Sequence, residues 1–323
     1  MERIDVNPPD ATVLHTEKTV GYDYADPARE IVTHLRLFPQ AHRGPQRLLS
    51  CDLDVWPPPA RVRQFNDEFG NGVVELFHNT PTDALRITAK LVTEHRGRDP
   101  RSFSRGRLGA LHAVPATGVG AFLVPSALAD HSVEADRAAR ELAPATLADL
   151  ERVERIGAWV YQTMRFQKGV TNIHTAASEA LAGRAGVCQD FAHVMLVICR
   201  AAGLPARYVS GFVPGEGYMH AWVEVLVREP LDGGAYWWGF DPTLNRPTNG
   251  RYLAVAVGRD YRDIAPLSGT FVGSAPGRLE TWTRTLVNAP MAQQGSGVLP
   301  MGLATLQSPG SERYRDAQRV IIQ

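Results

Sequence analysis

The fold is decided by one apolar stretch in the middle of the chain, Gly186-Val187-Cys188-Gln189-Asp190-Phe191-Ala192-His193-Val194-Met195-Leu196-Val197-Ile198-Cys199-Arg200-Ala201-Ala202. The stretch is closed by Gly203-Leu204-Pro205, a typical stop signal for a helix. Its apolar density predicts a helix that is buried on most sides. Cys188 stands at the first helical position, where free backbone amides and the helix dipole favour a negative charge. We therefore expect the Cys188 thiol to form a thiolate readily.

Helices are expected before this stretch and strands after it. Capping residues and an apolar period predict helices over residues 132–142, 146–164 and 175–181. Alternating side chains predict strands over residues 207–213, 219–227 and 236–243. One face of the second strand would be wholly apolar, and we expect that face to pack on the central helix.

Three residues of this region have the side chains of a nucleophilic site. Cys188 can attack a carbonyl carbon, and His220, held on a predicted strand, can act as its base. Asp241, at the end of the next predicted strand, can accept a hydrogen bond from the other ring nitrogen and so orient the imidazole. Chemistry of this kind proceeds through a thioester that either water or an amine resolves. The backbone N–H of Cys188 would donate to the developing oxyanion.

Four separated motifs occur in an order that resembles the bacterial transglutaminase-like family. They are Gly186-Val187-Cys188-Gln189-Asp190-Phe191-Ala192-His193, His220-Ala221-Trp222-Val223-Glu224-Val225, Gly239-Phe240-Asp241-Pro242-Thr243 and Val257-Gly258-Arg259-Asp260-Tyr261. The β-rich first hundred residues resemble the N-terminal module of that family. The resemblance implies a papain-like α+β core, the triad Cys188, His220 and Asp241, and neither a metal nor an organic cofactor. It also implies a peptide or protein amide as substrate, with a primary amine as co-substrate if the acyl group is transferred.

The resemblance leaves the reaction open, because related folds include cross-linking enzymes, proteases, peptide N-glycanases and arylamine acetyltransferases. The calcium-binding and barrel domains of animal transglutaminases have no counterpart in the sequence, so calcium activation is not expected. A different class of function is a non-catalytic binding or scaffolding protein that keeps the fold and uses its N-terminal module for contacts. An intact triad argues against that alternative.

Four further residues are candidates for the oxyanion site or for substrate contacts. Gln189 could supply a second donor to the oxyanion, and Trp159 could do so by analogy with animal transglutaminases. Asp190 could contact substrate, but a carboxylate in a first helical turn also complements the helix dipole. Trp222 could line a groove, although tryptophans in sheets are usually core residues. We expect His193 to form a core hydrogen bond rather than to act as the base.

The chain is expected to form an α+β protein of two domains with a tail. Strand signals over residues 12–95 predict an all-β module, interpreted as a β-sandwich, and an arginine-rich linker follows at residues 96–107. The expected boundaries are therefore 1–107 for the N-terminal module, 108–288 for the catalytic domain and 289–323 for a disordered tail. An anion-binding surface is the alternative interpretation of the arginine-rich segment.

Composition excludes several classes of partner. The 323 residues include 34 basic and 34 acidic side chains, so no charge excess predicts a nucleic-acid or membrane partner. The N-terminal sequence lacks the pattern of a signal peptide, and a cytoplasmic location is expected. Three cysteines are too few for a disulfide framework, and their spacing does not fit a zinc site. Cys51 and Cys199 are expected to be packing residues, and the sequence does not decide the oligomeric state.

Overall fold

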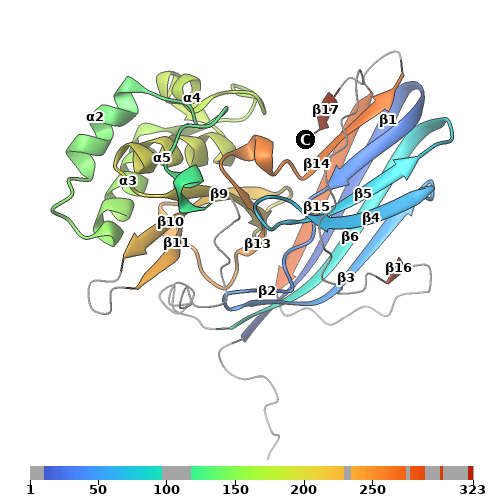
Figure 1. Cartoon of the computed structure of the whole chain (residues 1–323), viewed down its shortest axis with the longest axis horizontal. Coiled ribbons are helices and arrows are strands. Elements are labelled where there is room, and N and C mark those ends of the chain that lie inside the picture. The colour runs from blue at the N-terminus through green and yellow to red at the C-terminus, as the bar shows by residue number, and fades with distance from the viewer. Residues whose placement is uncertain are drawn as a thin grey trace, which may run out of the picture.

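The computed structural model describes residues 11–96, 118–228, 234–273, 277–287, 299–300 and 319–322. A strand-rich part lies on the right of Figure 1, and a part with four α-helices on a smaller sheet lies on the left. The expected linker at 96–107 lies outside the described residues except for Arg96. The tail from 289 also lies outside them, except for two short strands, β16 (Leu299–Pro300) and β17 (Arg319–Ile322).

One long strand, β1 (Ala11–Leu35), organises the first sheet. Its N-terminal half pairs with β6 (Thr82–Arg96) on one side and β15 (Arg278–Val287) on the other. Its C-terminal half pairs with β5 (Gly72–His78) and β14 (Leu267–Val272). The pairing with β6 is irregular between Asp23 and Ala28, where the sequence carries the Pro27 turn signal. The predicted strands on either side of Pro27 are therefore one strand with an irregular centre.

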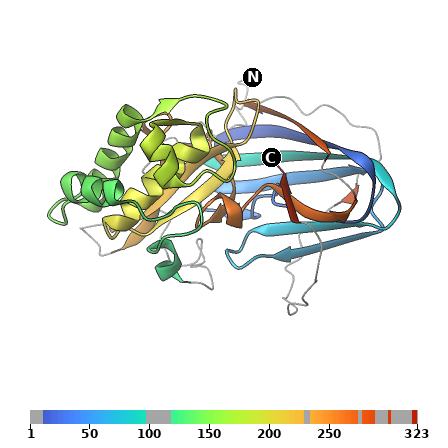
Figure 2. The same cartoon turned by 90° about the horizontal axis from the view of Figure 1, so that it is seen from above.

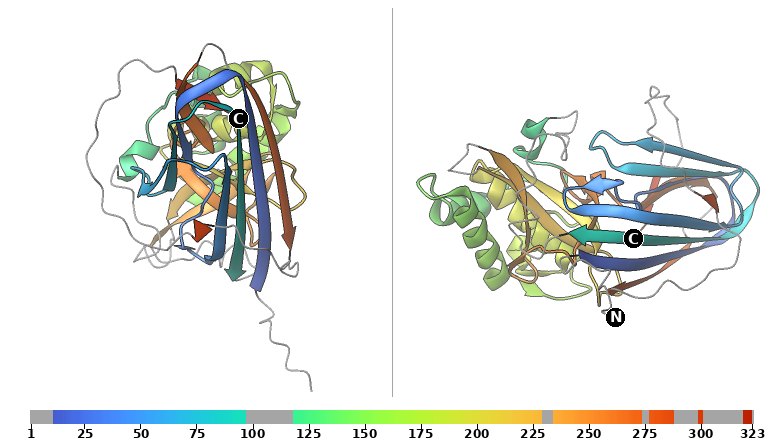
Figure 3. Two further views of the ribbon diagram at one scale, coloured as in Figure 1. Left: turned by 90° about the vertical axis from the view of Figure 1, so that its right-hand side faces the viewer. Right: turned by 90° about the horizontal axis from the view of Figure 1, so that it is seen from below.

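Five further strands bring the first sheet to ten strands among the described residues. They are β2 (His42–Arg43), β3 (Gln46–Trp56) and β4 (Arg61–Asn66), together with β16 and β17. The strands run lengthwise away from the helical part (Figure 3). Buried and partly exposed side chains alternate along the first half of β1. The inward-facing side chains are Leu14, Thr16, Lys18 and Val20.

The C-terminal strands do not stay with the helical part. The expected catalytic domain extends to residue 288, but β14 and β15 hydrogen-bond to β1 in the first sheet. The strand Arg278–Val287 therefore belongs to the first sheet and not to the sheet of the helical part. A period-2 pattern predicts a strand but contains no information about which distant strand it pairs with.

The helical part places α5 (Cys188–Ala201) at its centre. Every residue of α5 from Cys188 to Arg200 is buried, as its apolar density predicts. Around it lie α2 (Val133–Leu142), α3 (Asp149–Thr163) and α4 (Ala177–Gly183), which cover one side of the smaller sheet (Figure 2). Short elements connect them: η1 (Val119–Phe122), η2 (Tyr261–Asp263), and the paired strands β7 (Arg165–Phe166) and β8 (Ala185–Gly186).

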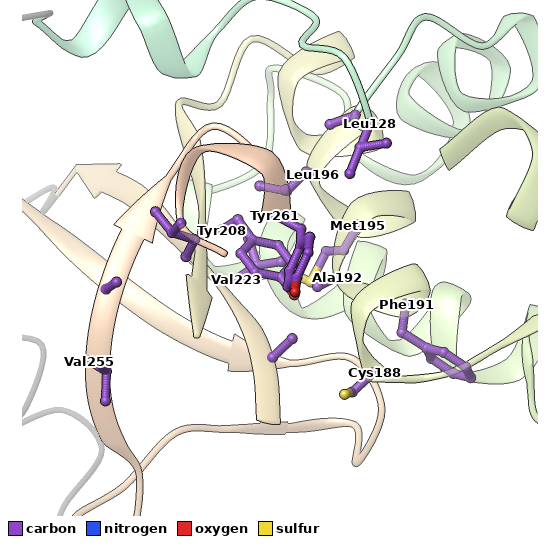
Figure 4. Packing of buried hydrophobic residues seen from close by; sticks show 14 of the residues in the cluster. Leu128, Cys188, Phe191, Ala192, Met195, Leu196, Tyr208, Val223, Val255 and Tyr261 are labelled. Atoms are coloured by element: carbon purple, nitrogen blue, oxygen red, sulfur yellow. The ribbon is translucent and has the colours of Figure 1, made fainter. Parts of the chain in front are cut away.

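The smaller sheet is antiparallel, with strand order β12-β11-β10-β9-β13. Its strands are β9 (Ala206–Phe212), β10 (His220–Arg228), β11 (Ala235–Asp241), β12 (Arg246–Pro247) and β13 (Leu253–Gly258). Three of them lie where the sequence predicts strands. Figure 4 shows side chains of α5 packed toward Tyr208, Val223 and Val255 of the sheet. The expected packing of the apolar face of β10 on the central helix is confirmed, since Val223 and Val225 share one core with α5.

The two parts are joined along β13, the edge strand of the smaller sheet. The side-chain amide of Gln46 exchanges two hydrogen bonds with the backbone of Ala254, each 2.9 Å long. Asn71 forms the same pair with Val257, at 2.8 Å for both bonds. Two side chains of the first part thus hydrogen-bond to this edge as a neighbouring strand would. These contacts fix the first sheet against the helical part.

Candidate active site

The start of α5 is held by the side chain of Asp190. Its Oδ2 accepts from the backbone N–H of Val187 and from the hydroxyl of Thr171, both at 2.7 Å. A Cβ at Gly186 would lie 2.4 Å from the same oxygen, so the tight approach of the chain requires glycine there. Burial raises the pKa of Asp190 above its ordinary value, although the hydrogen bonds from these donors lower it. Asp190 therefore stabilises the start of α5, which is the simpler of the two roles considered for it from the sequence.

Cys188 is the first residue of α5 and is 8% exposed. Its side chain and that of Phe191 point to opposite sides of the helix start (Figure 4). In the described part of the chain, the backbone N–H of Cys188 donates to no acceptor. A free N–H beside the thiol is the geometry that oxyanion stabilisation needs.

His220 lies at the first position of β10 and joins Cys188 to Asp241. Its Nε2 is 2.7 Å from Oδ2 of Asp241, which leaves Nδ1 for its hydrogen bond to the Cys188 thiol. Burial alone would lower the pKa of His220, but hydrogen bonds to Asp241 and to Cys188 outweigh it and raise the pKa to about 10. The ring is therefore an imidazolium at neutral pH.

Asp241 is fully buried and is held by donors on both oxygens. The Tyr252 hydroxyl donates to Oδ2 at 2.8 Å, beside the His220 contact. The backbone N–H groups of Thr243 and Leu244 donate to Oδ1 at 2.9 and 3.2 Å. Arg246 donates in turn to the Tyr252 hydroxyl at 3.0 Å. Both oxygens of Asp241 are engaged, so the orientation of the carboxylate is fixed.

The pocket beside Cys188 has a volume of about 410 Å³ and is lined by both parts of the protein. The helical part contributes Cys188, Gln189, His220 and Tyr208. The first sheet contributes Lys18, Val20 and Thr281 from its inner face. A pocket of this size is in the range of small-molecule and side-chain sites.

Of the four further candidates from the sequence, one lines this pocket and three do not. Gln189 lines it, and its side chain donates to the Ile173 carbonyl at 3.5 Å. Asp190, Trp159 and Trp222 do not line it. Trp159 packs from α3 against the main core, and Trp222 is 1% exposed in a second cluster behind His220. For Trp222 this is the core position that tryptophans in sheets usually occupy.

The other thiols and the second histidine are structural. Cys199 is fully buried, and burial raises its pKa to about 12. Burial also raises the pKa of Cys51. His193 is fully buried and accepts from the Tyr261 backbone N–H at 3.2 Å, as expected for a core hydrogen bond. Burial lowers its pKa to about 4, which leaves it neutral.

Two parts of the site were not found from the sequence. Tyr252 stands behind Asp241, and nothing in the local pattern distinguishes it from a core tyrosine. Lys18 lies on a strand of the first sheet, far from the motifs in sequence. A lysine at an inward position of an alternating strand was the one available signal, because lysine is rarely buried without a partner.

Across the residues that the structure describes, no group of three or more potential ligands could hold a metal ion. No helix in the described ranges is long and apolar enough to cross a bilayer.

Comparison with known proteins identifies the family of the chain. Residues 136–242 match the transglutaminase-like superfamily, and residues 14–94 match the bacterial transglutaminase-like N-terminal region. The chain belongs to the bacterial transglutaminase-like family. An uncharacterized protein of Mycobacterium leprae is 30% identical over 272 residues, covering 81% of this chain and 92% of the relative.

Two further similarities concern a named enzyme and a protein with a provisional description. A protein-glutamine gamma-glutamyltransferase of Pseudomonas aeruginosa is 37% identical over 101 residues, which is 26% of this chain and 14% of that enzyme. A crystal structure of a Cytophaga hutchinsonii protein, provisionally described as a cysteine protease, superposes with a TM-score of 0.67 at 22% identity. It covers 88% of this chain and 93% of that one, so the two share their fold.

Proposed function

We propose that this protein is a thiol-dependent acyl-transfer enzyme that acts on peptide-type amides, with Cys188 as nucleophile, His220 as acid and base, and Asp241 as the orienting group. The observation that carries the proposal is the continuous chain of hydrogen bonds from Cys188 through His220 to Asp241. A scaffold protein has no use for an imidazole held at both ends beside a thiol.

The first half-reaction uses the thiolate and the imidazolium together. The thiolate attacks the carbonyl carbon of the amide and forms a C–S bond, while the carbonyl oxygen becomes an oxyanion that accepts from the Cys188 N–H. When the intermediate collapses, the C–N bond breaks and His220 gives its Nδ1 proton to the leaving amine. A thioester on Cys188 and a neutral His220 remain.

The second half-reaction reverses these roles. Water or a primary amine gives a proton to His220 as it attacks the thioester carbonyl, and the C–S bond then breaks. The products are a carboxylic acid or a new amide, together with the regenerated ion pair. The Pseudomonas enzyme with the similar segment is named as a transferase, and the Cytophaga protein is provisionally described as a cysteine protease. The proposal therefore covers both outcomes, hydrolysis and amine transfer, in the cytoplasm.

A comparison of wild type with Cys188→Ala tests this proposal. Both proteins are incubated with a cytoplasmic extract, with and without a labelled primary amine, and the products are identified by mass spectrometry. We expect new peptide termini, or labelled adducts, that are formed by wild type and not by Cys188→Ala. Cys51→Ala is the matched control, since it removes a thiol on β3 outside the pocket lining and should behave as wild type.

Equal product patterns from wild type and Cys188→Ala would remove the enzymatic proposal and favour the scaffold. Adducts without cleavage would identify an amine transferase.

A further inference from the structure

The wall of the pocket opposite His220 carries a buried lysine. Lys18 is 5% exposed, lies on the inner face of β1 and lines the cavity that holds Cys188 and His220. Directly across the strands stand Ala89 on β6 and Thr283 on β15, neither of which carries a charge. Within the described part of the chain, Lys18 makes no hydrogen bond or ion pair. A buried ammonium without a partner is costly, so such groups usually serve a ligand.

Apart from the nucleophile Cys188, the charged side chains around the pocket are all cationic. Its lining contains Lys18, Lys168 and His220 but no described aspartate or glutamate. Lys168 is exposed at the opening, with Nζ 4.7 Å from the centre of the Tyr218 ring. Glu216 is hydrogen-bonded to the Tyr218 hydroxyl but does not line the cavity. The chain has only three lysines, and two of them line this one pocket.

Burial lowers the pKa of Lys18 to about 8, and no charged neighbour contributes to this shift. The ammonium form is therefore still the main form at pH 7, and an anion that entered the pocket would stabilise it further. The alternation of β1 fixes the side chain toward the pocket, and the Gln46 and Asn71 contacts hold this sheet against the helical part.

We propose that Lys18 forms an anion subsite in the Cys188 pocket, so that the preferred acyl donor carries a carboxylate close to the amide that is cleaved. This inference rests on the proposed function, because it assigns the substrate class of the same pocket. The N-terminal module thereby contributes directly to specificity. Lys168 at the opening would attract the same anion from solvent.

Two alkylating reagents test the subsite without a known substrate. Iodoacetate and iodoacetamide deliver nearly the same group to a thiol, but only iodoacetate carries a carboxylate. The rate of alkylation at Cys188 is measured with each reagent at pH 7, and the ratio of the two rates is compared between variants. We expect this ratio to fall about fivefold in Lys18→Met, because the carboxylate of iodoacetate loses its attraction to the ammonium.

Two further variants control for charge and folding. Lys18→Arg keeps the charge and should keep the ratio within about twofold of wild type. Lys90→Met removes the same charge from a lysine of β6 that does not line the pocket, and it should leave the ratio unchanged. If Lys18→Met does not fold, the wild-type ratio itself provides the test, because it should fall as the pH rises through about 8 and Lys18 loses its proton.

The possible failures are distinguishable. An unchanged ratio in folded Lys18→Met, or a wild-type ratio that is constant between pH 6 and 9, would overturn the anion subsite. Slow labelling of Cys188 by iodoacetamide would instead contradict the proposed function. The ratio of the iodoacetate rate to the iodoacetamide rate does not depend on how fast Cys188 reacts, so it would still show whether Lys18 attracts an anion.

Discussion

The two walls of the Cys188 pocket differ in how their polar groups are satisfied. On the helical wall, His220 bonds to Asp241 and Cys188, and Asp241 accepts from three further donors. On the first-sheet wall, Lys18 is just as buried but has no hydrogen-bond or ion-pair partner among the described residues. A satisfied wall is preorganised for a reaction, whereas an unsatisfied one is prepared for a ligand. Under the two proposals above, the helical part carries out the reaction and the first sheet contributes to recognition of the substrate.

The largest effect is expected on the helical wall. Asp241→Asn should lower the rate of acyl transfer by about 10³–10⁴-fold, because an amide neither stabilises the imidazolium nor selects the correct ring tautomer. The rate is measured on the substrate found in the extract experiment. Circular dichroism and the thermal midpoint should show that the variant is folded. A loss of less than tenfold would mean that Asp241 does not orient His220.

The second prediction concerns the stability of the first-sheet wall. The pKa of Lys18 is about 8 in the folded protein against 10.5 for an ordinary lysine, so its ammonium destabilises the fold by about 3 kcal/mol below pH 8. This destabilisation fades as the pH rises from about 8 to 10.5, because the unfolded chain binds more protons over that interval. Lys18→Met should therefore be more stable than wild type at pH 7, and the gap should narrow toward pH 10.

Urea denaturation of both proteins at pH 7 and pH 10 measures this gap. Lys90→Met, which removes a lysine of β6 outside the pocket lining, is the matched control. A gap that stays constant with pH would contradict the assigned burial of the ammonium.

Removing the Gln46 contact between the two parts should separate the reactivity of Cys188 from the preference for an anionic reagent. Gln46→Ala leaves the buried N–H and C=O of Ala254 without partners, which should lower the free energy of unfolding by about 2 kcal/mol. It should also reduce the preference for iodoacetate over iodoacetamide while Cys188 keeps its reactivity toward iodoacetamide. Gln40→Ala, which removes an exposed bond to the Gly70 carbonyl, is the matched control. A loss of both reactivities would show that the helical wall depends on the first sheet.

The smallest effect is expected at Tyr252, a positioning residue. Tyr252→Phe removes one of the donors to Asp241, which should lower kcat about tenfold with little change in KM, since the ring stays in place. The same change should move the alkaline limb of the pH profile to lower pH, because a less firmly held Asp241 supports the His220 imidazolium less well. An unchanged pH profile would indicate that Tyr252 is only a packing residue.

The local elements of the helical part could be predicted from the sequence because their signals are local. The start of α5 at Cys188 follows from the Gly186-Val187 turn and the apolar run after it, and its end follows from the stop signal Gly203-Leu204-Pro205. The strand of His220 follows from alternation. The order Cys188, His220, Asp241 then suggested a site, and the resemblance to a family supported it.

The first sheet could be predicted only in part because strand pairing is not local. The strands β14 and β15 pair with β1 across most of the chain, and no pattern within them indicates that partner. The expected β-sandwich stays a prediction, since ten strands are linked through β1. Lys18 was missed for the same reason: its role depends on which distant residues face it. The hydrogen bond of Tyr252 likewise depends on the fold of the loop after β12.

The measurement that tests the account most directly is the rate of iodoacetamide alkylation at each of the three cysteines between pH 5 and 9, in wild type and in His220→Ala. We expect fast labelling confined to Cys188 in wild type well below pH 8, with Cys51 and Cys199 nearly unlabelled because burial raises the pKa of both thiols. In His220→Ala, labelling of Cys188 near pH 6 should slow by at least about tenfold, since the imidazolium that supports the thiolate is gone. Labelling of Cys188 that is no faster than that of Cys51, or that is unchanged in His220→Ala, would contradict the account.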